Sequence, residues 1–284
     1  MQTRRNFLIT TALALPSLAI AQQDDKLPAA FAALEKKSGG RLGVAVLNTA
    51  TNQTAQYKAD ERFPFCSSFK FLLVAAVLHR IDTQKDDPRR QVDIPKQILG
   101  SSPITQSHAG TSMTIGALIN SILVRSDNTA ANVLLDTVGG PAALTAYVRT
   151  LGDQVFRLDR TETALNESKP GDPRDTTSPA AMLADLKTLL LGNALTPDSR
   201  NTLTQGMQDC VTGLARIRAG IPKTWRVADR NGANGENTTA NIAAIWPTNK
   251  PPVLIAAYVT ECPGPEEKRN AIFVEIGRLV AASV

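Results

Sequence analysis

Histidine and closely spaced cysteine are scarce in this chain. Its 284 residues contain only two histidines, His79 and His108, in unrelated sequence contexts. This scarcity argues against a zinc site built from histidines. The three cysteines, Cys66, Cys210 and Cys262, are far apart and form no CxxC pair, which excludes a zinc ribbon and a thioredoxin-type motif. We therefore expect no metal or other cofactor.

A basic stripe and a membrane span of ordinary length are also missing. The 31 Lys and Arg residues slightly outnumber the 26 Asp and Glu residues, but they are scattered, so we expect no nucleic-acid partner. The apolar run over residues 7–21 is shorter than the roughly 20 residues of a spanning helix. It follows Arg4 and Arg5 and ends in Ala19-Ile20-Ala21, which is typical of a cleaved signal peptide and indicates no stable membrane anchor.

Removal of residues 1–21 predicts a periplasmic or secreted protein. Residues 3–8 (TRRNFL) resemble a twin-arginine export signal, although a generic basic segment before an apolar run would look the same. No apolar interface stripe is visible in the remaining chain, so we expect a monomer.

Hydrophobic periodicity places strands at both ends of the mature chain and helices in the middle. The helices are expected over residues 26–37, 67–81, 114–123, 128–138, 141–151, 178–191 and 265–282. The strands are expected over residues 41–48, 54–58, 225–228, 238–246 and 253–259. A single sheet would have to pair the two ends. We expect an α/β domain from residues 22–60 and 208–284, and a helical domain over 61–207 that includes a long loop, 158–177.

Two short motifs carry serines. Ser67 and Lys70 form S-x-x-K at the expected start of a helix, where a lysine of lowered pKa can activate a serine nucleophile. An incidental serine beside a solvated lysine is the alternative. In Ser126-Asp127-Asn128, the serine can pass a proton and the asparagine can orient an amide. The alternative there is a helix N-cap at Asp127 or Asn128.

Two further segments carry charge. In the loop 158–177, Glu162 and Asn166 can hold and activate a water, and a salt bridge between Arg160 and Asp175 would close the neck of the loop; the alternative is a set of surface charges.

In the second segment, Asp229 to Gly232, Arg230 can bind a carboxylate and the glycine lets a ligand lie close to the backbone. A hairpin turn at Asn231-Gly232 is the alternative interpretation.

Taken together and in this order, these motifs resemble the class A serine β-lactamases. The resemblance covers nearly the whole mature chain and includes the segments RFPF (62–65), SDNTAAN (126–132), DRTETALN (159–166), DPRDTTSP (172–179) and IWP (245–247). It implies the fold shared with penicillin-binding proteins: an antiparallel sheet flanked by helices and packed against an all-helical domain. It also implies hydrolysis of penicillins, and of cephalosporins, through a serine acyl-enzyme.

The resemblance implies a role for each candidate residue. Ser67 would attack the β-lactam carbonyl, and either Lys70 or Glu162 acting through a water would be the base for that step. The implied roles of the others are water activation for release (Glu162, Asn166), proton transfer to the ring nitrogen (Ser126), an oxyanion hole of backbone N–H groups (Ser67, Ala233), and substrate binding (Asn128, Arg230, Asn231, Gly232, Arg216).

The chain departs from the family pattern at several positions. Asn231 stands where the family usually has a threonine or serine, and Ser101 stands where an aromatic side chain usually lines the entrance. Cys66 precedes the nucleophile as in carbapenem-hydrolysing relatives, but the position of its usual disulfide partner is Asn234. Cys66 is therefore either a small buried residue or a partner for Cys210 or Cys262, which could also pair with each other.

Two other functions remain open from the sequence. A penicillin-binding D-alanyl peptidase shares S-x-x-K but normally lacks the loop glutamate. A divergent homologue that traps β-lactams without turnover would account for Asn231 and Ser101.

Overall fold

The computed structural model describes residues 26–284, so the signal peptide expected over residues 1–21 lies outside the described residues. A five-stranded sheet has the order β2-β1-β9-β8-β7, and each neighbouring pair is antiparallel. Its strands are β1 (Arg41–Asn48), β2 (Gln53–Tyr57), β7 (Arg226–Ala233), β8 (Thr239–Trp246) and β9 (Val253–Thr260). The two ends of the chain meet where β1 lies beside β9, as the sequence predicts.

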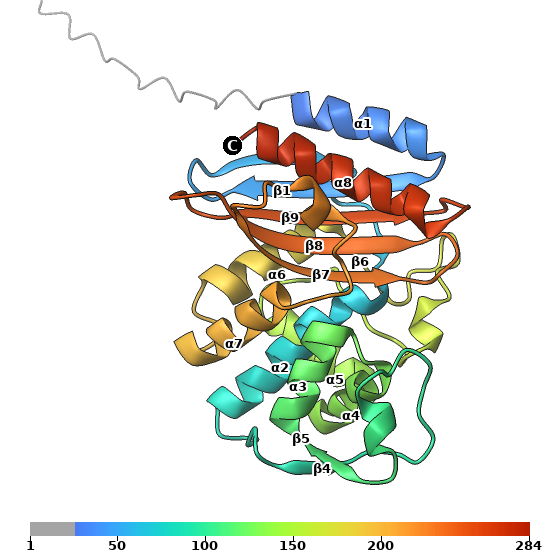
Figure 1. Ribbon diagram of the computed structural model, residues 1–284, viewed down its shortest axis with the longest axis vertical. Coiled ribbons are helices and arrows are strands. Elements are labelled where there is room, and N and C mark those ends of the chain that lie inside the picture. Colours follow the sequence, from blue (N-terminus) through green and yellow to red (C-terminus); the bar gives the residue numbers. More distant parts are fainter. Residues whose placement is uncertain (1–25) are drawn as a thin grey trace, which may run out of the picture.

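Strand β9 is buried along its whole length because both faces of the sheet are covered (Figure 1). Val44, Val46 and Ile255 face α1 (Lys26–Ser38) and α8 (Glu266–Ala282). On the opposite face, Ala45 and Ala256 join a larger core with the remaining helices. The sheet is thus the middle layer between two hydrophobic cores.

Lys70 and Asn128 are the first residues of two of the remaining helices. The remaining helices are α2 (Lys70–Asp82), α3 (Ile115–Arg125), α4 (Asn128–Val138), α5 (Gly140–Thr150), α6 (Pro179–Leu191) and α7 (Pro197–Gln208). Every residue of α2 from Lys70 to Leu78 is buried, and α2 packs against α3, α4, α5 and α7. The first turn of α2 is therefore held rigidly from several sides.

Short elements complete the chain. The short strands are β3 (Phe63–Pro64), β4 (Gln91–Asp93), β5 (Ser112–Thr114) and β6 (Thr176–Thr177), and the 3₁₀ helices are η1 (Cys66–Phe69), η2 (Thr105–His108), η3 (Ala164–Asn166) and η4 (Ile217–Gly220). β3 pairs with β6, which ties the end of the loop 158–177 to the segment before the serine. The expected division of the chain at residues 60 and 207 stays a prediction.

Three local expectations need correction. The α-helix of the S-x-x-K motif begins at Lys70, because residues 66–69 form the tighter turn η1. Helix α7 was not expected, although Thr196 accepts a hydrogen bond as its N-cap and Pro197 occupies its first turn. The strand predicted over 225–228 continues to Ala233, so the hairpin turn considered at Asn231-Gly232 is wrong.

The cysteines form no disulfide. Cys66, Cys210 and Cys262 all lie within the described residues, and all three are buried and free. None of the helices within residues 26–284 combines the length and apolar character that crossing a membrane requires. In the same part of the chain, no group of three or more His, Cys, Asp or Glu side chains is arranged to hold a metal ion.

Candidate active site

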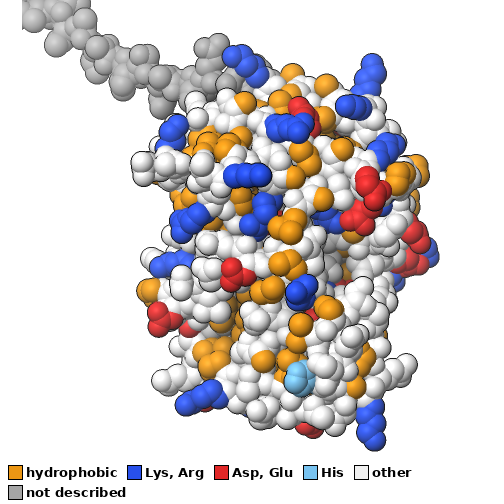
Figure 2. Space-filling view, in the orientation of Figure 1, with side chains coloured by type: hydrophobic (Ala, Val, Ile, Leu, Met, Phe, Trp, Pro, Cys, Tyr) orange, Lys and Arg blue, Asp and Glu red, His pale blue; other side chains and the backbone are white. Residues whose placement is uncertain are grey.

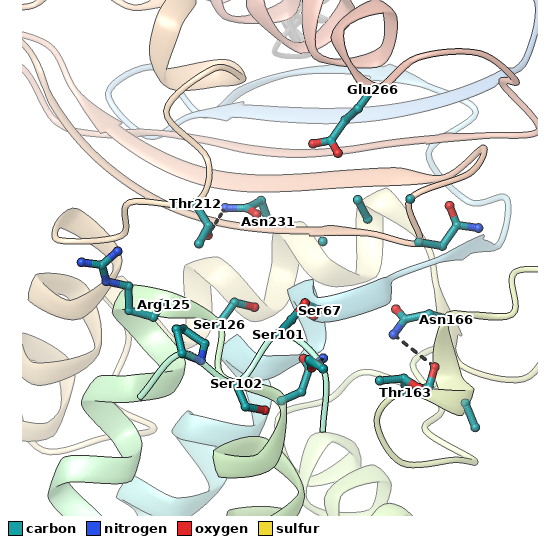
Figure 3. A pocket seen from close by; sticks show the side chains of 18 of the residues that line it. Ser67, Ser101, Ser102, Arg125, Ser126, Thr163, Asn166, Thr212, Asn231 and Glu266 are labelled. Carbon is teal, nitrogen blue, oxygen red and sulfur yellow. Dashed lines mark hydrogen bonds between the residues drawn. The ribbon is translucent and has the colours of Figure 1, made fainter. Parts of the chain in front are cut away.

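Ser67 lies in η1, at the edge of a cleft of about 1260 Å³ between the sheet and the helices (Figure 3). Its Oγ donates a hydrogen bond to Glu162 Oε1 at 3.0 Å and accepts one from Lys70 Nζ at 3.0 Å. A hydroxyl that touches both a carboxylate and an amine has two candidate proton acceptors. This arrangement is that of an activated nucleophile.

Lys70 is fully buried at the first turn of α2. Its Nζ also donates to Asn128 Oδ1 at 2.6 Å and to the backbone carbonyl of Ser126 at 2.9 Å, and lies 2.8 Å from Glu162 Oε1. Burial, followed by the positive charge of Arg230, lowers the pKa of Lys70 to about 8, and the negative charge of Glu162 opposes this fall. A substantial fraction of Lys70 is therefore neutral a little above neutral pH.

The segment Ser126-Asp127-Asn128 serves both purposes considered from the sequence. Asp127 is the N-cap of α4 and accepts a hydrogen bond from Ala130 N. Ser126 adopts the left-handed conformation (φ 59°) at the end of α3, and its Oγ lies 3.4 Å from Lys70 Nζ. The cap thus holds Ser126 and Asn128 on the two sides of the lysine.

Glu162 reaches the cleft from the loop 158–177, and its side chain is fully buried. Asn166 Nδ2 donates to Glu162 Oε2 at 2.7 Å, while the backbone N–H and carbonyl of Glu162 both bond to the side chain of Asn132. The sequence analysis did not identify Asn132 as a site residue, although it is the last residue of SDNTAAN. Two side chains, that of Asn166 in η3 and that of Asn132 in α4, therefore hold Glu162 in position.

The neck of the loop is closed as predicted. Arg160 Nε donates to Asp175 Oδ2 at 2.6 Å, and Asp175 Oδ1 accepts from the backbone N–H groups of Asp159 and Arg160. Asp175 is buried, so this ion pair is shielded from water. The bond holds together the two ends of the segment that carries Glu162.

Strand β7 forms the opposite wall of the cleft, where Asn231, Gly232 and Ala233 all line it. A Cβ atom at Gly232 would lie 2.5 Å from Ser67 N and 2.8 Å from the carbonyl oxygen of Phe65. Only glycine therefore lets the strand lie this close to the nucleophile. The backbone N–H of Ser67, in η1, and that of Ala233, in β7, therefore lie on adjacent walls of the cleft.

Arg230 lies behind this wall rather than on it. Its side chain is fully buried and is not among the residues that line the cleft. Its Nη1 lies within hydrogen-bond distance of the carbonyl of Leu123 (3.3 Å), Cys210 Sγ (3.3 Å) and Thr212 Oγ1 (3.4 Å). Arg230 therefore places a positive charge beside the cleft without reaching its surface.

Arg216 lines the cleft but is only 4% exposed. It donates to the carbonyls of Gly232 and Ala240, to Asn270 Oδ1 and, at 3.0 Å, to Glu266 Oε1. Glu266 partly neutralises Arg216 at the rim of the cleft. The sequence analysis missed Glu266 and Asn270 because α8 carries no recognisable motif.

Three of the positions at which the sequence departs from the family pattern, Ser101, Cys66 and Asn234, lie at or near the cleft. Ser101 lines the entrance of the cleft with a small, exposed side chain, so no aromatic ring stands there. Cys66 is fully buried with its Sγ 3.8 Å from Ser168 Oγ, and burial raises the pKa of its thiol to about 12. The interpretation of Cys66 as a small buried residue is confirmed. The side chain of Asn234 caps its own turn by accepting from the N–H groups of residues 236–238.

Comparison with known proteins agrees with this geometry. A family model described as "Beta-lactamase enzyme family" matches residues 26–284. The chain belongs to this family. It is 45% identical to the β-lactamase CTX-M-25 of Escherichia coli over 98% of this chain and 97% of that one. It is 42% identical to β-lactamase L2 of Stenotrophomonas maltophilia, with 98% of each chain covered.

Solved structures of class A β-lactamases share the fold. An ancestral class A β-lactamase superimposes with a TM-score of 0.89 at 51% identity, covering 91% of this chain and all of that one. A β-lactamase from Xanthomonas campestris gives a TM-score of 0.89 at 41% identity, covering 91% of this chain and 97% of that one. The fold expected from the resemblance is therefore confirmed.

The face seen in Figure 2 carries side chains of both charges. Figure 2 shows Lys and Arg side chains distributed over this face, with Asp and Glu side chains between them. A scattered distribution of this kind is that of an ordinary solvated surface.

Proposed function

We propose that this protein hydrolyses the β-lactam ring of penicillins and cephalosporins through an acyl-enzyme on Ser67. The observation that carries the proposal is the position of Glu162, which contacts both Ser67 Oγ and Asn166. A D-alanyl peptidase normally lacks this loop glutamate and is therefore not favoured. A homologue that only traps β-lactams would be expected to lack this contact of Glu162 with Ser67 and Asn166.

Acylation begins at the Ser67 hydroxyl. Its oxygen attacks the β-lactam carbonyl carbon, and its proton passes to Glu162 or to the neutral form of Lys70, both of which it touches. A proton taken by Glu162 passes on to Lys70 Nζ, 2.8 Å away, after Lys70 has given its own proton to Ser126, so Glu162 is ionised again before release. The oxyanion lies against the N–H groups of Ser67 and Ala233. Ser126 then gives its proton to the ring nitrogen as the C–N bond breaks, and it regains a proton from Lys70 Nζ, 3.4 Å away.

Release of the product uses the loop. Glu162 Oε2 and Asn166 hold a water molecule against the acyl carbonyl, and Glu162 takes a proton from the water as it attacks. The Ser67–acyl bond then breaks and the proton returns to Ser67 Oγ. The closure of the loop by Arg160 and Asp175 supports this step because it fixes the carboxylate within hydrogen-bond reach.

Substrate recognition uses the remaining lining residues. Asn128 binds the side-chain amide, although its Oδ1 also faces Lys70, and its Nδ2 donates to the carbonyl of Gly100. Asn231 and Gly232 line the wall beside the substrate carboxylate, and Arg230 and Arg216 supply positive charge to that wall. No metal or other cofactor takes part in these steps. The protein acts as a monomer, in the periplasm or after secretion.

The test is multiple turnover by the chain without residues 1–21. A chromogenic cephalosporin is mixed with the purified protein, and product is counted per mole of enzyme over time. We expect many product molecules per enzyme. A burst of about one equivalent that then stops would instead show a trapping protein, and release of D-alanine from a peptidoglycan peptide would show a peptidase.

A further inference from the structure

The amide N–H groups of Asn231 are taken up by acceptors of the protein. Its Nδ2 donates to Thr212 Oγ1 at 3.0 Å (labelled in Figure 3) and lies 3.7 Å from Cys210 Sγ. Both N–H bonds of the amide are therefore directed at acceptors of the protein. The amide oxygen that remains cannot donate a hydrogen bond to an anionic substrate group.

Thr212 is a cleft residue to which the sequence analysis gave no role. It is exposed, it lines the cleft, and its Oγ1 accepts from Asn231 Nδ2 and lies 3.4 Å from Arg230 Nη1. A hydroxyl has one proton to donate as well as lone pairs to accept with. Because donors from two residues of β7 face its oxygen, its own proton is left for a group in the cleft.

The sulfur of Cys210 does not need the proton of the Thr212 hydroxyl. Cys210 Sγ lies 3.3 Å from Arg230 Nη1 and 3.7 Å from Asn231 Nδ2, both of which are donors. The sulfur therefore has donors of its own, and the proton of Thr212 Oγ1, 3.3 Å from it, is not required there.

The backbone also fixes Thr212 in place. The N–H of Val211 donates to the carbonyl of Val124 at 3.1 Å, and the N–H of Arg216 donates to the carbonyl of Gly213 at 3.0 Å. A Cβ atom at Gly213 would collide with Asp229 Oδ2 and Asn231 Nδ2. The absence of a side chain at Gly213 therefore lets this segment pack directly onto β7 beside Asn231.

We propose that Thr212 supplies the hydroxyl that binds the carboxylate of the β-lactam, in place of the hydroxyl that position 231 lacks. The charge of buried Arg230 acts on the substrate through this hydroxyl, which Arg230 Nη1 approaches to 3.4 Å. This inference rests on the proposed function and adds the residue that donates the hydrogen bond to the substrate carboxylate at this wall of the cleft.

The test compares a substrate with and without its carboxylate. Thr212→Val and Thr212→Ser are assayed with a chromogenic cephalosporin and with its methyl ester, with Thr202→Val on exposed α7 as the matched control. We expect Thr212→Val to lower kcat/KM for the free acid by roughly 10- to 100-fold, the range for a hydrogen bond to a charged group. The ester should lose much less, and Thr212→Ser should retain most of the activity.

A second comparison assigns the donor to one of the two side chains. We expect Asn231→Ala to cost less than Thr212→Val, and Asn231→Thr to restore activity to the Thr212→Val variant. A larger loss in Asn231→Ala, or an equal loss on acid and ester in Thr212→Val, would overturn the inference. Absence of turnover by the unaltered chain would overturn the proposed function as well, whereas normal turnover with unaffected Thr212→Val would overturn only this inference.

Discussion

Replacing Glu162 with glutamine should separate acylation from release. Glu162 and Lys70 form a buried ion pair, and the negative charge of Glu162 raises the pKa of the lysine. Without that charge the pKa of Lys70 falls below its present value of about 8, so a larger fraction of Lys70 is neutral at pH 7 than in the unaltered protein. A neutral Lys70 that touches Ser67 Oγ at 3.0 Å is a competent base, and acylation should continue.

In the release step, Lys70 does not replace Glu162 as the base. A positioned general base contributes roughly 10²- to 10⁴-fold to the rate of the step it serves, so deacylation should slow by that factor. Glutamine has nearly the shape of glutamate, and its new N–H group can find an acceptor. No donor among the described residues reaches the buried Oδ1 of Asn166. A half-turn of the Asn166 amide would present that oxygen to the new N–H group of residue 162.

Intact-protein mass spectrometry after mixing with a penicillin measures the result. Because ring opening expels no atoms from a penicillin, the Glu162→Gln variant should gain the full mass of the drug and keep it. Glu275→Gln, an exposed glutamate on α8 paired with Arg278, is the control and should show no persistent adduct. Unchanged deacylation in Glu162→Gln would refute its role as the base for release, and failure to acylate would refute the role given to Lys70.

Three further substitutions test the supports of the site. Asp175→Asn removes the charge partner of Arg160, so we expect faster hydrogen exchange over residues 158–177 and slower deacylation, by roughly 10-fold for a local loss of about 1–3 kcal/mol. Asp127→Ala removes a buried carboxylate that accepts four hydrogen bonds, so we expect a loss of about 3 kcal/mol or more and a fall in Tm of roughly 6–12 °C in calorimetry. Asp185→Asn should raise stability at neutral pH. Burial and then the charge of Asp153 hold the pKa of Asp185 well above 3.8 in the folded form, so the folded form keeps a proton that the unfolded form releases, and this costs stability as the pH rises. Asparagine needs no such proton.

Each of these expectations has a contrary result. Unaltered exchange over residues 158–177 in Asp175→Asn would show that the loop is held without the ion pair. A Tm change under about 2 °C in Asp127→Ala would show that water replaces the carboxylate. For Asp185→Asn, the Tm difference from the unaltered chain should grow as the pH rises above 4; a difference that does not change with pH would contradict a raised pKa of Asp185.

The catalytic centre was largely predictable from the sequence because its residues lie in short motifs. The contacts among Ser67, Lys70, Ser126 and Glu162 were expected, and the structure brings all four side chains together. Helical spacing accounts for the pair Ser67 and Lys70. The long loop made Glu162 a candidate, but its contact with Ser67 followed only from the resemblance, since nothing in the chain's local pattern indicates that a residue 95 positions away reaches the serine.

The walls of the cleft were harder to predict. Local pattern made Asn231-Gly232 a turn candidate, but pairing of Gly232 with Ala240 keeps both residues within β7. Tertiary pairing overrode the local signal, as is common for strands. Glu266 and Asn270 are read in the sequence as ordinary residues of an exposed helix, and only the fold places them against Arg216.

Asn231 illustrates why a departure from a motif is hard to interpret from the sequence alone. At the level of the motif, replacing a hydroxyl with an amide suggests weakened substrate binding. The structure shows that the amide instead donates to the hydroxyl of Thr212, a residue 19 positions earlier that lies on the same cleft. A site requires a donor at a point in space rather than at a position in the chain. A substitution on β7 can therefore be offset by a neighbouring segment, provided that a residue such as Gly213 lets the two pack together.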